Sequence, residues 1–156
     1  MIEPQTFESW KYLVDPEANR LAYSQIDHGS AADCNCDDCV YWNENRLRFM
    51  PKKVLDWFEL VGIDAAKEAE VSEFQAEPDN KLFIGNYWLV GELESGPDAY
   101  QPHADGNGAS FTPTSIAPGF KFGLSSSTKF GPPVPESLAD KSPLMQVLFE
   151  VSVTNP

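Results

Sequence analysis

The chain changes its hydrophobic period near residue 80, and this change constrains the fold more than any other feature. Before it, the stretch MPKKVLDWFELVGID places Val54, Trp57, Phe58 and Val61 at the i, i+3, i+4, i+7 spacing of one helix face. After it, apolar residues recur in strand-like runs up to the last segment. Helices followed by strands predict an α+β fold, in which N-terminal helices pack on a mostly antiparallel sheet.

Two short helices are predicted in the stretch FESWKYLVDPEANRLAYSQIDHG. Phe7, Trp10 and Val14 lie at helical spacing in the first of them. Asp15 and Pro16 supply an N-cap and a first-turn proline for the second.

The helix that contains Val54 to Val61 has clear end signals. Pro51 marks its start, and Gly62 is suited to the left-handed conformation that ends it, with Ile63 folding back as in a Schellman motif. Asp64 then offers an N-cap to a shorter helical segment that is expected to run to about Val71.

Strands are predicted in two places by composition and alternation. The run LFIGNYWLVGEL is aromatic and β-branched, and Gly91 within it indicates a bulge or a close backbone approach. In the segment PLMQVLFEVSVTNP, apolar residues stand at every second position from Met145 to Val153, which predicts a strand with one buried face. Between them, residues 95–143 contain eight of the thirteen prolines, so we expect long loops there, with short strands near 110–113 and 119–124.

Length and composition favour one domain. A chain of 156 residues with 42% hydrophobic and 12% aromatic residues is long enough to bury a core. We therefore expect residues 1–156 to form a single α+β domain, with a helical part over about 1–75 and a β-rich part over about 80–156.

The charge balance limits the classes of partner. Twenty-four acidic residues against eleven basic ones give a formal net charge of -13. Nucleic acids and anionic membrane surfaces are not expected partners, because affinity for them comes from lysines and arginines. A basic protein is the expected partner, although the charge is also explained by solubility alone. The first thirty residues do not resemble a signal peptide, and no apolar run reaches the roughly 20 residues of a membrane span, so a soluble cytoplasmic protein is expected.

The stretch DCNCDDCVYW contains all three cysteines of the chain. Cys34, Cys36 and Cys39, with His28 six residues upstream, form a set of soft and borderline ligands of the kind that holds structural zinc. The sequence therefore predicts a metal site at His28, Cys34, Cys36 and Cys39, with zinc as the metal. The fourth ligand can also be a more distant group or water.

The aspartates in this stretch bear on the choice between metal and redox chemistry. Asp33, Asp37 and Asp38 are expected to raise the pKa of the thiols, which disfavours a redox nucleophile. A divalent cation relieves the same negative charge, which favours a metal site. Structural thiols without a metal and a redox or disulfide role stay open as alternatives, as does an iron–sulfur cluster.

Four segments together, CNCDDC, MPKKVLDWFELVGIDAAKEAEVSEF, NYWLVGEL and PLMQVLFEVSV, resemble a group of uncharacterised small bacterial proteins with a CxCxxC element. In that group the cysteines precede a helix of the form FPxxVLxFFxxLGID, a GxYHxVGEL strand and a QxxFEV strand. This chain departs from the pattern at Trp88, where the group often has histidine. The resemblance implies a likeness in size and acidity to immunity proteins of bacterial toxin systems.

These features predict a non-enzymatic binding protein with a structural zinc site, and the resemblance adds an immunity-type role against a basic toxin. The alternative is an enzyme. Either a thiol oxidoreductase would use Cys36 and Cys39, or a hydrolase would hold zinc with one open coordination position. A protein that stores or passes on metal is a third class.

Overall fold

The computed structural model describes residues 2–154. Its elements in chain order are β1 (Glu3–Phe7), β2 (Trp10–Val14), α1 (Pro16–Ser24), the 3-10 turn η1 (Ser30–Asp33), α2 (Asp37–Phe49), α3 (Lys52–Val61), β3 (Glu70–Glu77), β4 (Asn80–Ser95), β5 (Tyr100–Pro102), β6 (Ala109–Phe111), β7 (Thr114–Ala117), β8 (Phe120–Ser125), the 3-10 turn η2 (Glu136–Leu138) and β9 (Leu144–Thr154).

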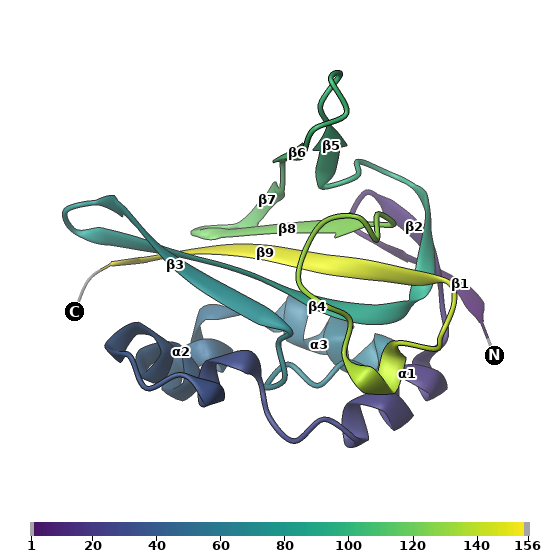
Figure 1. Ribbon diagram of the computed structural model, residues 1–156, viewed down its shortest axis with the longest axis horizontal. Helices are drawn as coiled ribbons and strands as arrows, with labels where there is room; N and C mark the ends of the chain where they lie inside the picture. The colour runs from purple at the N-terminus through teal and green to yellow at the C-terminus, as the bar shows by residue number, and fades with distance from the viewer. Residues whose placement is uncertain (1, 155–156) are drawn as a thin grey trace.

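The predicted α+β class is confirmed. Within residues 2–154, seven strands form one sheet in the order β1-β2-β4-β9-β8-β7, and β3 pairs with the first half of β4. All paired strands of this sheet run antiparallel. Helices α1, α2 and α3 lie together on one face of the sheet, while β5 and β6 stand on the other side (Figure 1).

Two predicted helices form where their end signals place them. Asp15 caps α1 by accepting a hydrogen bond from the Ala18 amide at 3.1 Å. Gly62 ends α3 with φ +89°, and the Ile63 amide donates to the Phe58 carbonyl at 2.9 Å. This is the predicted Schellman motif, and α3 buries Val54, Trp57, Phe58 and Val61 as its spacing indicates.

The helix predicted around Phe7 to Val14 is wrong. These residues form the β1–β2 hairpin, with Glu8 at φ +52° in its turn. Trp10, Tyr12 and Val14 point inward at every second position, and all three are buried. The same apolar residues fit both periods over so short a stretch, and pairing of β2 with β4 decides the outcome.

The helical segment predicted from Asp64 to Val71 is also wrong. The Asp64 carboxylate accepts a hydrogen bond from the Ala66 amide at 3.0 Å, as a helix cap would, but the chain makes a single turn there. β3 then starts at Glu70 and pairs with β4. Glu68, which lies between this turn and β3, is buried, and its tertiary contacts stabilise the chain in a non-helical conformation despite the local cap. The proposed helical part over 1–75 therefore begins with a hairpin and ends inside a strand.

Helix α2 was not predicted, although its sequence carries charge signals of a helix. Asp37 and Asp38 lie in its first turn, and Arg46 and Arg48 lie in its last turn. This distribution complements the helix dipole at both ends. The apolar pattern of α2 is weak, because the helix buries only two residues, Trp42 and Arg46.

The predicted strands are confirmed. β9 buries the predicted face, but Gln146 and Leu148 on its other face are buried as well, so only its second half alternates in burial. β4 is a single strand of sixteen residues that crosses the sheet. Gly91 allows a close backbone approach, since a Cβ there would lie 2.6 Å from the Leu13 carbonyl oxygen. In the proline-rich region, β8 corresponds to the strand predicted at 119–124. β6 covers the first half of the strand predicted at 110–113, and β7 starts directly after it.

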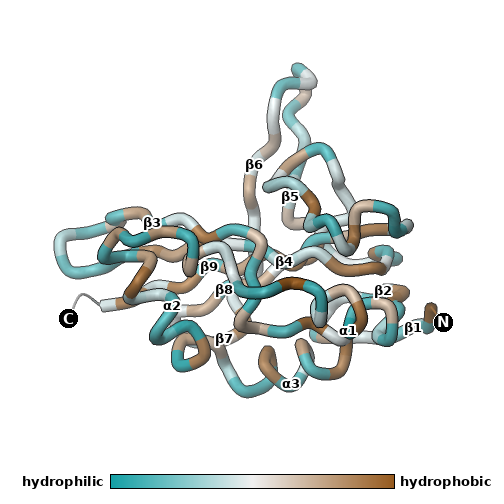
Figure 2. The backbone as a smooth tube through the Cα atoms, turned by 60° about the horizontal axis from the view of Figure 1, so that its bottom comes forward, coloured by the Kyte–Doolittle hydropathy of each residue, from teal (hydrophilic) through white to brown (hydrophobic). Residues whose placement is uncertain are grey.

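An aromatic core fills the space between the helices and the sheet. The ring of Trp42 in α2 stacks on Phe149 of β9 with centroids 5.3 Å apart and an angle of 6°. Trp57 of α3 donates its indole N–H to the Tyr12 hydroxyl at 2.6 Å. On the opposite side, the β5–β6 hairpin projects away from the body of the protein (Figure 2). No helix among residues 2–154 has the length and apolar character needed to cross a bilayer.

Candidate metal centre

The three cysteines gather at the N-terminus of α2. Cys34 directly follows the turn η1, Cys36 is the N-cap residue of α2, and Cys39 lies in the first turn of that helix. Their sulfur atoms lie within 4.8 Å of one another, so the three thiols can hold a metal ion together. A short turn that leads directly into a helix brings residues i, i+2 and i+5 to one point.

Backbone amides hold two of the sulfurs in place. The Cys36 amide donates to the Cys34 sulfur at 3.5 Å, and the Cys39 amide donates to the Cys36 sulfur at 3.4 Å. The Cys36 sulfur thus occupies the place that a serine or aspartate oxygen has in an ordinary N-cap. These amide donors and the positive end of the helix dipole make the start of α2 a favourable place for negatively charged groups.

The thiols differ in acidity. The hydrogen bond from the Cys36 amide lowers the pKa of Cys34, and side-chain hydrogen bonds with the other two cysteines lower it further. The pKa of Cys39 is raised to about 12, first by its hydrogen bond with Cys34 and then by burial. A pKa this high favours a proton on the Cys39 sulfur. A metal ion that displaced it would have to offset this preference.

The aspartates were expected to raise the pKa of the thiols, but they are not among the causes of the pKa shifts of Cys34 and Cys39. The causes of the pKa shifts of Cys34 and Cys39 come from the cysteines and from burial. Asp38 forms an ion pair with Lys81 of β4, and Asp33 lies 2.6 Å from His28. Lys81 therefore compensates the charge of Asp38.

His28 is held away from the thiols. Its Nε2 atom lies 2.6 Å from the Asp33 carboxylate, and its side chain is about half exposed at 49%. Among the described residues, the group with ligand atoms close enough to share a metal contains only the three cysteines. His28 therefore stays a predicted fourth ligand.

The cluster is open to solvent. Cys34 and Cys36 are exposed, Cys39 is partly buried, and all three are free thiols. Three protein sulfurs leave one position of a tetrahedral metal for water or another donor. The ion pair between Asp38 and Lys81 ties this end of α2 to the sheet.

A buried polar cluster that the sequence did not indicate fixes α2 further along. The Glu68 carboxylate accepts hydrogen bonds from the Trp42 indole and the Arg46 guanidinium, each at 2.7 Å. Burial raises the pKa of Glu68 even though Arg46 opposes the shift. Glu68 lies 26 positions after Trp42 and 22 positions after Arg46, so no local sequence pattern connects them. Only the fold reveals this cluster.

Comparisons with known proteins do not place the chain in a family. No protein-family model matches it, and no match occurs among the curated proteins or the solved structures. The resemblance to the group with the CxCxxC element stays a prediction.

Proposed function

We propose that this is a metal-binding protein in which Cys34, Cys36 and Cys39 hold one zinc ion. The observation that supports the proposal is the approach of the three sulfurs to within 4.8 Å of one another. Sulfurs bound to a tetrahedral zinc at about 2.3 Å lie about 3.8 Å apart. The thiols therefore need to move by about 1 Å or less to bind the ion.

The role proposed for the ion is structural. It would join the end of η1 to the first turn of α2 and replace the thiol proton of Cys39. Water, His28 after release from Asp33, or a group of a partner would supply the fourth ligand. A net charge of -13 makes a basic protein the best-fitting partner.

Metal analysis of protein purified without oxygen tests this proposal. We expect close to one zinc per chain in the wild type, and at least a tenfold lower content when all three cysteines are replaced by serine. Asn35→Ser is a matched control, because it changes the same loop and leaves the sulfurs intact. The proposal is wrong if the folded wild type contains no zinc above background, or if the triple variant retains it.

Thiol oxidation is the second candidate function. It is favoured by the placement of Cys36 at an exposed N-cap and of Cys39 three residues later and less exposed. In this function, two thiols would form a disulfide while a disulfide substrate accepts two electrons and two protons.

Alkylation rates distinguish the two candidates. Zinc-bound thiolates should react slowly with iodoacetamide until a chelator is added. Fast alkylation of zinc-free wild type, followed by loss of disulfide reduction in Cys36→Ser, would support the redox function in its place.

A further inference from the structure

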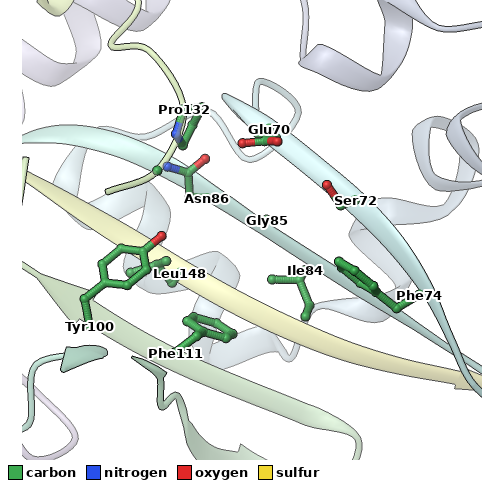
Figure 3. A pocket seen from close by; sticks show the side chains of 11 residues that line it. Glu70, Ser72, Phe74, Ile84, Gly85, Asn86, Tyr100, Phe111, Pro132 and Leu148 are labelled. Carbon is green, nitrogen blue, oxygen red and sulfur yellow. The ribbon is translucent and has the colours of Figure 1, made fainter. Parts of the chain in front are cut away.

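A second concave site lies on the face of the sheet opposite the helices. It is a cavity of about 290 Å³ between β3, β4 and β9 below and the β5–β6 hairpin and the loop after β8 above. Its apolar lining comes mainly from Phe74, Ile84, Tyr100, Phe111 and Leu148 (Figure 3). Tyr100 and Phe111 are cross-strand partners in the hairpin, so the two rings form one wall. The cavity is separate from the cysteines, which lie on the helical side.

Asn86 presents an unused acceptor to this cavity. The residue is 3% exposed, and its Oδ1 atom has no hydrogen-bond partner among the described residues. Leaving such an atom unpaired in the interior costs free energy, and a ligand with a donor group relieves that cost.

The orientation of the Asn86 amide follows from its neighbours. Gln146 donates its NH₂ group to the carbonyl oxygens of Ser127 at 3.1 Å and Phe130 at 2.6 Å. Its Oε1 atom must therefore be an acceptor, and it receives the Asn86 NH₂ group at 2.7 Å. The oxygen of Asn86 is left for the cavity. Gly131 makes this chain of contacts fit, because a Cβ at that position would lie 2.4 Å from Gln146 Oε1.

A carboxylate lies beside this acceptor. Glu70 of β3 is the cross-strand partner of Asn86, and both side chains lie at the same end of the cavity (Figure 3). Glu70 is exposed at the mouth and is the only charged residue of the lining. Burial raises the pKa of Tyr100, and the charge of Glu70 adds to that shift, so this charge acts across the cavity. The polar end thus combines a negative charge with a buried acceptor.

We propose that this cavity binds a small organic cation, a primary amine attached to a compact aromatic or apolar group. The ammonium group would donate to Asn86 Oδ1 and to the Glu70 carboxylate, and the apolar group would lie against Ile84, Leu148 and the aromatic wall. Charge-assisted hydrogen bonds with an ammonium match the Asn86 oxygen and the Glu70 carboxylate, which are both acceptors, whereas the charge of Glu70 would repel an anionic ligand. A volume near 300 Å³ is at the small end for ligand pockets, which suits a single ring with a short chain.

Titration with three ligands of similar shape tests the proposal. 2-Phenylethylamine carries a positive charge, 2-phenylethanol is neutral and 3-phenylpropanoate is negative. We expect the amine to bind at least tenfold more tightly than the alcohol in calorimetry, and the carboxylate not to bind. The methyl resonances of Ile84 and Leu148 should shift on addition of the amine, which locates the ligand independently of any variant.

Two charge-neutralising variants on the same strand complete the test. Glu70→Gln should weaken amine binding by about tenfold, the order expected for the loss of one charge-assisted contact. Glu73→Gln is the matched control, because Glu73 lies on the other face of the sheet near Asp38 and should leave binding unchanged. The proposal is overturned if the amine binds no better than the alcohol, if Glu70→Gln binds it as tightly as wild type, or if the two methyl resonances do not move.

Discussion

At the scale of the residue, Glu68 is a buried carboxylate with unequal oxygens. One oxygen accepts hydrogen bonds from Trp42 and Arg46, while the other has no partner within the described residues. The side chain of Arg46 is 7% exposed, so the pair is an ion pair in the interior. Removing one member of such a pair leaves an uncompensated charge, which costs far more than the loss of a surface pair.

We expect Arg46→Met to lower the free energy of unfolding by about 3 kcal/mol, because Glu68 is then left in the interior without a counterion. The double variant Arg46→Met with Glu68→Gln removes both charges and keeps an acceptor for Trp42, so it should be more stable than the single variant. Denaturant titration measures both. A single variant as stable as wild type would show that the pair contributes little.

The same residue predicts a pH dependence. The pKa of Glu68 is raised above its usual value of 4.5, so the folded state binds this proton more tightly than the unfolded state does. Its contribution to stability is complete below about pH 4.5 and is lost as pH rises through the folded-state pKa. The free energy of unfolding of Glu68→Gln should therefore fall less than that of wild type over this range. A steeper fall in the variant would contradict the assignment.

At the scale of the element, the end of α3 depends on one glycine. Gly62 has φ +89°, and a Cβ there would lie 2.4 Å from the Pro16 carbonyl oxygen. The adjacent α1 is also joined to this end, since Asn19 donates to the Val61 carbonyl at 2.8 Å and accepts from the Val90 amide at 2.7 Å. Gly62 therefore serves both the conformation of the cap and the packing of two helices on β4.

We expect Gly62→Ala to lower the free energy of unfolding by about 2 kcal/mol or more, from backbone strain of about 1 kcal/mol together with the clash. Gly106→Ala is the matched control. Gly106 has φ +78°, but no atom lies within 4 Å of its added Cβ, so only the strain applies. Thermal unfolding compares the two variants. Equal losses would show that the contact with Pro16 relaxes without cost.

At the scale of the whole molecule, excess negative charge opposes compaction. The chain carries a formal net charge of -13. Exposed ion pairs such as Lys52 with Asp56 contribute little to the free energy of folding and do not offset this repulsion. Salt screens repulsion among exposed charges over distances beyond about 10 Å at 0.1 M.

We therefore expect the free energy of unfolding to rise between 20 mM and 300 mM sodium chloride, as measured by urea titration. Because salt also acts on solvent, a series in which sucrose matches the osmolality is the control. A fall in stability with salt would mean that attractive ion pairs outweigh the repulsion.

The sequence by itself determined the α+β class, helices α1 and α3, and strands β4 and β9, because long periodic runs with clear caps leave one low-energy choice. It also determined the closeness of the three cysteines, since their spacing needs only one turn and one helix start. Tertiary structure alone decided the β1–β2 hairpin, the start of β3 and the course of residues 64–69, where a short local pattern fits two structures and long-range pairing selects one. The Glu68 cluster and the Asn86 cavity arise from residues distant in the chain, and only the packed sheet brings those residues together.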